Sequence, residues 1–506
     1  MKCKAPILLL LVALLLLSCF AGCKTDSQSP ETQTSPPGDQ ATDTASGGED
    51  PSGPQYAYDE DGFILDNLPE LSFEQQNVNL LHWQGYKPEY SLEDGDDIIS
   101  SAVYSRILSL EERLKCFLTI KYMPGDWNSR SEFNNTVYND VQTGEPEYDI
   151  VSQYSFCAPV LTMYGCYRNL NEIDYIDLDM PWWNSEIRES VQVGDKLYFA
   201  TGDIAPSVIY NTYCILFNYD TIQSHGYSVD ALYQTALDRE WTLEALETML
   251  TNTYRDLNQD GLGNNGDFFG ISVFDLVHFD SLFYAAGLKI FEKNESTGNY
   301  VLSSDYTGSK TITLAEDCIR IFHSENSIIG DSNQNFVDGN SLFALTTFGQ
   351  VTGRMTEAKF KYGILPVPMF DSAQGEYSSS LAVPYSMYSV TYGCSDYARA
   401  GAVLEALASH AYRKVTPAIY EEGLKTRYAK DDISGQIYDI IRETVVFDIG
   451  RLWGEEVKAD GVDNAFALFR NTVNQKKSWS TQINAAKGIY VQRLENIINA
   501  LNALDH

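Results

Sequence analysis

Residues 77–83 read NVNLLHW, an alternation of polar and apolar side chains that is typical of a half-buried strand. An amphipathic helix is expected to follow over 97–113, and a second strand over 116–120. The same order returns in a helix expected over 131–142 and a strand over 148–151. This alternation predicts an α/β fold with largely parallel sheets, in which ligands bind beyond the carboxyl ends of the strands.

Length and composition set further limits. The chain has 506 residues, enough for two domains. It carries 70 Asp and Glu against 35 Lys and Arg, a negative charge that repels phosphate backbones and argues against a nucleic-acid partner. The 33 tyrosines suit surfaces that bind polar ligands. The sequence has no zinc-protease, nucleophile-elbow, Walker or dinucleotide-binding motif, so it gives no positive reason to assign catalysis.

The first 22 residues are typical of a secretory signal peptide, because two lysines precede an apolar run over 5–17 and small residues follow. The end of this segment resembles a bacterial lipobox, in which Cys23 is lipidated, with Cys19 as the alternative. A diacyl anchor there would hold the protein on the extracellular face of the cytoplasmic membrane. Residues 23–70 begin with a run rich in Ser, Thr, Gln, Pro and Gly and are expected to form a flexible tether. The six later cysteines are too scattered to predict a disulfide framework.

Four segments, in order along the chain, resemble family 1 extracellular solute-binding proteins, the ABC-importer receptors that include sugar binders of the maltodextrin type. They read GEPEYDIV at 144–151, GDKLYFATGD at 194–203, WTLE at 241–244 with DLNQDG at 256–261 and FGI at 269–271 behind it, and FKYGILPVP at 360–368. The resemblance implies a two-lobed, type II periplasmic-binding-protein-like fold. Each lobe is then a sheet flanked by helices, and the ligand cleft lies between the lobes.

The resemblance also implies how the chain divides and what it does. Residues 71–200 begin lobe 1, 204–365 begin lobe 2, 370–410 return to lobe 1, and 411–506 are mostly helical and belong largely to lobe 2. The implied function is capture of a small solute, above all a carbohydrate, by a monomer that closes around it for the permease subunits of an ABC importer. No cofactor is required. Peptides and other solutes stay open as ligands, and a surface-anchored glycan-active enzyme or a receptor for a sensor kinase stay open as functions.

The resemblance places candidate ligand residues at strand ends and at the passages between the lobes. Their chemistry suits a sugar, because aromatic faces stack on sugar rings while Asp, Gln and His bond hydroxyls. Trp182 and Trp183 are instead expected to pack beneath the lobe junction. The candidates are His82, Trp83, Gln84, Gln153, Tyr154, Thr201, Gly202, Asp203, Phe348, Gln350, Asp448 and Trp453.

An acidic loop follows the helix expected near 241–255. Its spacing matches the EF-hand calcium loop at positions one, three, five, six, nine and twelve. Aspartate in place of glutamate at the last position shortens the bidentate arm, so the loop predicts a weak calcium site. A turn that binds no ion is the alternative. The candidate ligands are Asp256, Asn258, Asp260, Leu262, Asn264 and Asp267.

Overall fold

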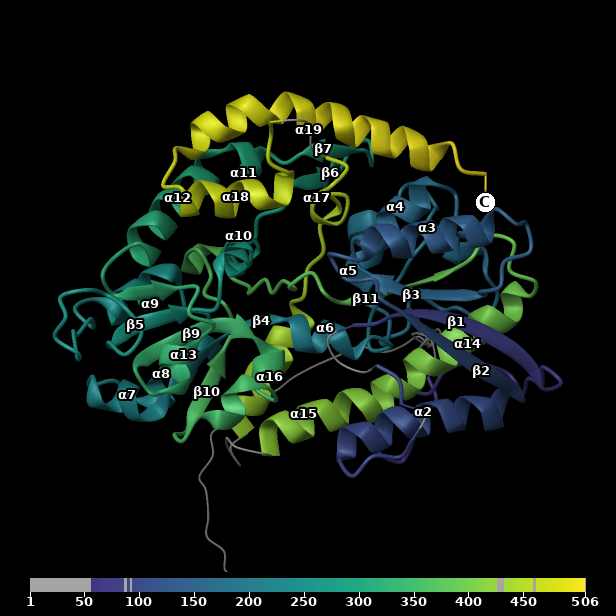
Figure 1. The fold of residues 1–506 in the computed structure, drawn as a ribbon, viewed down its shortest axis with the longest axis horizontal. Coiled ribbons are helices and arrows are strands. Elements are labelled where there is room, and N and C mark those ends of the chain that lie inside the picture. Colours follow the sequence, from purple (N-terminus) through teal and green to yellow (C-terminus); the bar gives the residue numbers. More distant parts are fainter. Residues whose placement is uncertain (1–55, 86–88, 92, 426–431, 458–460, 506) are drawn as a thin grey trace, which may run out of the picture. The chain divides into compact units, whose positions relative to one another are not determined.

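Two mixed β-sheets organise the described part of the chain in a computed structural model (Figure 1). The expected signal peptide, the candidate lipidation sites Cys23 and Cys19, and the first part of the tether lie outside the described residues. The structure describes residues 56–505, apart from 86–88, 92, 426–431 and 458–460.

The first sheet has the strand order β11-β3-β1-β2 and forms the core of the first lobe. Its central strand β1 carries the alternating segment, and Val78, Leu80 and Leu81 are fully buried there. β1 runs parallel to β2 and β3, whereas β11 runs antiparallel to β3. The strands are β1 (Gln76–Trp83), β2 (Cys116–Met123), β3 (Ile150–Tyr154) and β11 (Ser386–Val390).

The second sheet has the strand order β10-β4-β9-β5-β8 and forms the core of the second lobe. β5 runs parallel to β8 and β9, whereas β4 runs antiparallel to β9 and β10. β4 and β9 are buried along their whole length, as expected for strands covered on both faces. The strands are β4 (Tyr213–Asn218), β5 (Phe269–Val273), β8 (Ser327–Ile329), β9 (Ser341–Thr347) and β10 (Tyr362–Leu365), and a separate hairpin joins β6 (Phe291–Lys293) and β7 (Tyr300–Leu302).

Both sheets are mixed, whereas the sequence pattern predicted largely parallel sheets. The antiparallel strands are the ones that adjoin the passages between the lobes. The chain crosses over 199–212 to enter the second sheet at β4, and it leaves through β10 and returns over 366–385 to β11. A strand that is reached from the other lobe needs no crossover helix on its own sheet, so it can pair antiparallel with its neighbour.

Helices cover both faces of the first sheet (Figure 1). α2 packs against α14 and α15 on one face, while α3 and α4 lie together on the other. α2 begins after Asp97, whose carboxylate accepts a hydrogen bond from the backbone N–H of Ser100. The bounds are α2 (Ile98–Leu114), α3 (Arg130–Val141), α4 (Cys157–Met163), α5 (Ser185–Val191), α14 (Tyr397–His410) and α15 (Thr416–Lys425).

The second sheet is covered in the same way. α16 packs on β10 and α8, and α18 packs against α10 and α12. The chain passes from α15 in the first lobe to α16 in the second across 426–431, outside the described residues. The bounds are α6 (Pro206–Asn211), α7 (Tyr219–Ser224), α8 (Val229–Leu237), α9 (Leu243–Leu250), α10 (Phe279–Ala285), α11 (Ser304–Thr307), α12 (Ser309–Phe322), α13 (Gln334–Val337), α16 (Asp432–Glu443), α17 (Ile449–Leu452) and α18 (Ala465–Asn474).

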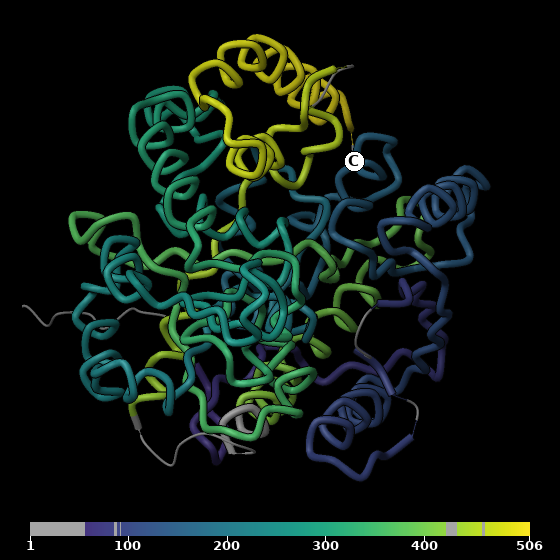
Figure 2. Tube along the Cα trace, turned by 60° about the vertical axis from the view of Figure 1, so that its left-hand side comes forward, coloured from purple at the N-terminus to yellow at the C-terminus, as the bar shows by residue number. Residues whose placement is uncertain are grey.

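The last helix, α19 (Trp479–Asn502), connects the two lobes (Figure 2). It contacts α12 and α18 in the second lobe and α4 in the first. Beyond its end, the Nζ of Lys196 donates to the carbonyl oxygens of Asn502, at 3.1 Å, and Leu504. The helix therefore begins on one lobe and is fastened to the other. Neither α19 nor any other helix of the described residues is long and apolar enough to cross a membrane.

All six cysteines in the described part of the chain are buried free thiols. They are distributed over strands, helices and connecting segments of both lobes, and all six belong to the hydrophobic core. Their packing is that of small hydrophobic side chains. The six are Cys116, Cys157, Cys166, Cys214, Cys318 and Cys394.

Candidate functional site

The candidates at the end of β1 are mostly buried within the first lobe. His82 is 2% exposed, and its Nδ1 lies 2.8 Å from the Oγ of Ser152. Burial lowers the pKa of His82 to about 3, so the ring is neutral at physiological pH. The indole N–H of Trp83 donates to the Oγ of Ser386 at 2.7 Å, and this bond links β1 to the returning strand β11. Gln84 is exposed.

The candidates at the end of β3 contribute to the same buried layer. The amide of Gln153 donates to the Oγ of Ser389 across the β3–β11 pair at 3.0 Å. The ring of Tyr154 packs between Trp83 and Phe156, with centroid distances of 5.3 and 5.7 Å. Phe156 continues this aromatic row toward the second lobe. The row thus begins in the core and ends at the lobe junction.

The candidates of the first passage are held tightly by their neighbours. The hydroxyl of Thr201 donates to the carbonyl of Ser386 at 2.8 Å. Gly202 approaches the backbone so closely that a Cβ there would lie 2.1 Å from the carbonyl oxygen of Trp182, which only glycine avoids. Asp203 follows, with its side chain largely buried. Close backbone packing at Gly202 and the hydrogen bond of Thr201 therefore both limit which residues the passage can carry.

The candidates after β9 lie in a short 3₁₀ helix, Phe348–Gln350, that follows the strand directly. The ring of Phe348 packs against Tyr420 and Tyr438, with centroid distances of 5.9 and 5.3 Å. Phe348 is buried, whereas Gln350 is half-buried. These residues therefore face the C-terminal helices α15 and α16.

The two candidates near α17 flank that short helix. Asp448 is its N-cap, because its carboxylate accepts hydrogen bonds from the N–H of Gly450 at 2.7 Å and from that of Ile290 at 2.5 Å. Burial raises the pKa of Asp448 to about 6. Trp453 ends the helix and packs against Phe199 of the first passage, with the centroids 5.5 Å apart. α17 is therefore fixed at both ends, by the second lobe and by the passage.

Side chains from both lobes meet around Arg451 of α17, and we call this group the junction cluster. Its Nη2 lies 3.8 Å from the Oδ2 of Asp280 on α10, and its guanidinium lies 5.2 Å from the ring centroid of Tyr284 on the same helix. Arg470 of α18 approaches the same Asp280 oxygen at 2.6 Å. Tyr385, which directly precedes β11, lines a small cavity beside this group together with Tyr284 and Arg451. The junction cluster consists of Asp280, Tyr284, Tyr385, Arg451 and Trp453.

Several polar atoms of the junction cluster are buried without a hydrogen-bond partner among the described residues. They are the Nη1 of Arg451, the Oδ1 of Asp280, the hydroxyl of Tyr284 and the indole nitrogen of Trp453. Each such atom costs about 1–3 kcal/mol when nothing pairs with it. Native proteins keep few of them, so a concentration of four in one place indicates a site for polar groups from outside the chain.

The lobes also touch directly beside the junction cluster. Phe156 of the first lobe packs against Phe466 of α18 with a centroid distance of 5.3 Å. Arg130, at the start of α3, lies over the ring of Trp127 at 3.7 Å and 3.9 Å from a carboxylate oxygen of Glu455. Aromatic rings and one ion pair therefore join the lobes at the edge where the strands of the first sheet end.

Sequence reasoning missed Asp280, Tyr284 and Arg451. They lie within helices and not at strand ends, and only the tertiary structure brings α10 and α17 together. One signal was available in the sequence, because Asp280 and Ser281 interrupt the apolar run FDSLFYAAGL at 279–288. An aspartate within an otherwise apolar helix is seldom fully buried unless an opposite charge or a hydrogen-bonding group pairs with it.

The tryptophan pair packs as expected. Trp182 and Trp183 are buried, and their indole N–H groups donate to the two carboxylate oxygens of Glu405 on α14, at 3.1 and 2.8 Å. Glu405 is also buried, and this burial raises its pKa to about 8. A single carboxyl group thus fixes both rings beneath the first passage.

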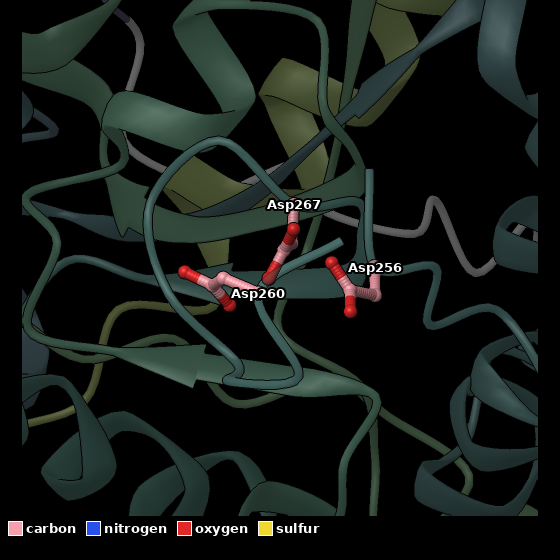
Figure 3. A group of neighbouring side chains, drawn as sticks. All are labelled: Asp256, Asp260 and Asp267. Atoms are coloured by element: carbon pink, nitrogen blue, oxygen red, sulfur yellow. The ribbon is translucent and has the colours of Figure 1, made fainter. Parts of the chain in front are cut away.

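The acidic loop brings three carboxylates together (Figure 3). One oxygen from each of Asp256, Asp260 and Asp267 lies within 4.8 Å of the others. The Oδ1 of Asn264 accepts from the amide of Asn258 at 3.0 Å, so the two asparagine candidates lie in the same loop structure. Calcium prefers carboxylate and amide oxygens as ligands, and the three carboxylates and the asparagines of this loop are oxygen donors of that kind.

Comparisons with known proteins identify the fold. No protein-family model and no curated protein sequence matches the chain. The galacto-N-biose-/lacto-N-biose I-binding protein of the ABC transporter from Bifidobacterium longum matches with a TM-score of 0.52 and 12% identity, over 84% of this chain and 98% of that chain. The cyclic α-maltosyl-1,6-maltose-binding protein from Arthrobacter globiformis gives 0.52 and 11%, over 83% and 100%. UspC from M. tuberculosis gives 0.51 and 11%, over 82% and 100%.

The described chain therefore has the two-lobed α/β fold of periplasmic solute-binding proteins. Its structural neighbours include two sugar-binding proteins, one of which belongs to an ABC transporter. The predicted fold class is confirmed, and the resemblance to solute-binding proteins is confirmed at the level of the fold. At identities of 11–12%, the likeness establishes the fold alone.

Proposed function

We propose that this chain captures a small solute, a carbohydrate, between its lobes and presents it to an ABC importer without making or breaking a bond. The junction cluster carries the proposal. It brings several aromatic rings, and four polar atoms that find no hydrogen-bond partner within the described chain, to the place where both lobes meet. Binding pockets combine apolar and aromatic walls with a few polar groups in the same way.

The polar atoms of the cluster match the hydroxyls of a sugar. Arg451 and Trp453 donate, the Oδ1 of Asp280 accepts, and the hydroxyl of Tyr284 does either. The cavity that Tyr284 and Arg451 line holds only about 10 Å³, so a sugar enters when the lobes move apart. A solute that touches both lobes then stabilises the closed arrangement, which the permease subunits recognise.

The remaining sequence candidates take two roles in this proposal. Tyr154 and Asp448 border the junction cluster and contribute to ligand binding. His82, Trp83, Gln153 and Thr201 hold the strand ends and the first passage in place through the hydrogen bonds described above. A lipid on Cys23, or on Cys19, keeps the protein on the extracellular face of the cytoplasmic membrane.

Replacing Tyr284 by phenylalanine separates ligand binding from folding. The hydroxyl has no partner among the described residues, so the free energy of unfolding is expected to stay the same or rise slightly. Sugar affinity is expected to fall about tenfold, because a hydrogen bond to the ligand is lost. A thermal-shift screen against mono- and oligosaccharides identifies the sugar. At a hundredfold excess over its Kd, the bound sugar raises the free energy of unfolding by about 2.7 kcal/mol. Titration calorimetry then compares the sugar affinities of the wild type and Tyr284→Phe. The sugar recovered after incubation with the protein is analysed for new reducing ends, which would show that it had been cleaved.

Tyr306→Phe is the matched control. The Tyr306 hydroxyl is buried too, but it donates to the carbonyl of Ala465 at 2.7 Å. Its removal is expected to lower the free energy of unfolding by about 1 kcal/mol and leave sugar affinity unchanged. Absence of any sugar response, or turnover of the sugar, would contradict the proposed function. An unchanged affinity in Tyr284→Phe would remove the junction cluster as the binding site.

Calcium at the acidic loop remains a prediction. Added calcium is expected to raise the Tm of the wild-type protein, with an affinity at the weak, extracellular end of the range, about 10⁻⁴–10⁻³ M. Asp260→Asn is expected to abolish the rise, because it removes one of the three converging carboxylates. Asp338→Asn changes an exposed aspartate outside the loop and should keep the rise. Equal Tm values with calcium and with chelator would contradict the prediction.

A further inference from the structure

The first half of α19 is anchored to the second lobe. The indole N–H of Trp479, at the start of the helix, donates to the carbonyl of Tyr306 at 3.0 Å, and the two rings pack with their centroids 5.2 Å apart. One helical half farther on, the hydroxyl of Tyr490 donates to the carbonyl of Asp463 at 2.7 Å. Trp479 and Tyr490 are both buried. These contacts fix the helix to α11 and to the segment that precedes α18.

The end of α19 is held by the first lobe, through Lys196. The Nζ of Lys196 donates to the carbonyl oxygens of Asn502, at 3.1 Å, and Leu504. Its positive charge also lies at the negative end of the helix dipole, where a cation is favoured. The turn that carries Lys196 is itself fixed, because the Oδ1 of the buried Asn169 accepts from the N–H of Leu197 at 3.0 Å.

Leu504, beyond the last turn of α19, lines a cavity on the first lobe that we call the tail seat. The cavity measures about 470 Å³, and its walls include Val141, Met163, Tyr164 and Tyr392. Tyr164 and Tyr392 are 60% and 43% exposed, and Leu504 is half-buried. The tail seat thus encloses Leu504 only in part. Since apolar stabilisation grows with the area removed from water, Leu504 holds the tail less strongly than a core residue does.

The tail seat lies at the end of the first sheet that is remote from the passages. β11 enters the sheet from the returning passage at Ser386 and ends at Val390, so Tyr392 stands beyond its far end. The end of the chain accordingly lies beside α3 and α4 (Figure 1). Displacement in a rotation grows with distance from the axis. When the lobes rotate apart about the passages, the tail therefore cannot keep its place in the seat.

We propose that α19 is a latch, whose tail at 502–505 holds the two lobes together and leaves Lys196 and the tail seat before the lobes part. The two attachments differ as a latch requires. The second lobe keeps the helix through buried rings and hydrogen bonds, whereas the first lobe holds only its half-buried end, so α19 moves with the second lobe. The purpose of the latch rests on the proposed function, because the latch sets how often the junction cluster opens to a solute.

Thiol labelling of the protein without any sugar tests the latch. Phe466→Cys places a thiol in the buried contact with Phe156 between the lobes, where a maleimide dye reacts when the lobes part. In this background, Lys196→Met removes both hydrogen bonds and Leu504→Ala removes most of the side chain in the seat. Each is expected to speed labelling at position 466 at least about fivefold. Lys487→Met, at an exposed lysine of the same helix, is the matched control and should label at the unaltered rate.

The native thiols Cys157 and Cys214, buried in the first and second lobes, report unfolding of each lobe. Faster labelling at position 466 in Lys196→Met or Leu504→Ala, with unchanged labelling in Lys487→Met and at both native thiols, supports the latch. Equal rates at position 466 in all variants overturn it. An equal acceleration in Lys487→Met or at a native thiol also overturns it, because the tail is then not what restrains the lobes. Since no solute is added, a missing sugar response does not affect this result, and failure of the latch does not affect the proposed function.

Discussion

Asp280→Ala is expected to lower the free energy of unfolding by about 3–5 kcal/mol. The Asp280 carboxylate is buried between two arginines, 2.6 Å from Arg470 and 3.8 Å from Arg451. Burial raises the pKa of Asp280, and the two guanidinium groups oppose this rise. Removal of the carboxylate leaves Arg451, itself almost fully buried, without a counter-charge, and an unpaired charge in the interior is far more costly than the pair is stabilising.

Urea unfolding followed by circular dichroism measures this effect. Glu376→Ala is the control, because Glu376 forms an exposed ion pair with Arg239 at 3.2 Å and its loss is expected to cost less than about 1 kcal/mol. A change below about 1 kcal/mol in Asp280→Ala would show that the junction cluster does not hold α10 to α17. A double variant, Asp280→Leu with Arg451→Met, is expected to recover part of the lost stability, because it removes both charges together.

Stability is expected to fall by about 3–5 kcal/mol between about pH 5 and pH 8 through Glu405 alone. Burial raises the pKa of this carboxyl from 4.5 to about 8, while the hydrogen bond from Trp183 opposes the rise. In this pH range the folded state binds the proton and the unfolded state does not. The contribution of Glu405 is therefore fully present below about pH 4.5 and is lost as the pH rises through about 8.

Glu405→Gln makes this contribution measurable. Glutamine offers an acceptor to only one of the two indoles, so the variant is expected to be less stable than wild type at pH 5. The difference should shrink toward pH 8, because glutamine does not ionise. Glu357→Gln, at an exposed glutamate, should show a difference that stays flat. A difference between wild type and Glu405→Gln that is independent of pH would mean that Glu405 ionises normally in the folded protein.

Much of the fold could be predicted because it is encoded in local patterns. The strand at 77–83 is β1, and the helices expected over 97–113 and 131–142 are α2 and α3, each displaced by about one residue. The direction of strand pairing could not be predicted in the same way. β4 and β11 run antiparallel to their neighbours because the chain reaches them from the other lobe. The local pattern of apolar residues does not show where the chain passes between the lobes.

The candidate site was less accessible from the sequence. Strand ends were chosen as places to search, and the ligand roles assigned there stay predictions. Alternation does not say whether a side chain such as His82 faces the core or the lobe junction. Trp453 became a candidate through the family resemblance, whereas Arg451, two positions earlier, did not. Its importance comes from Asp280, which lies far away in sequence and next to it in space.

The buried thiols make the native surface chemically inert toward oxidants. The thiolate is the reactive form of cysteine, and burial raises the pKa of all six described thiols, to about 11 for Cys116 and about 12 for Cys157. The described part of the chain therefore folds with its six thiols reduced and shielded from reagents in solution. Because both lobes contain such thiols, alkylation with a maleimide dye reports when each lobe unfolds, without any engineered label.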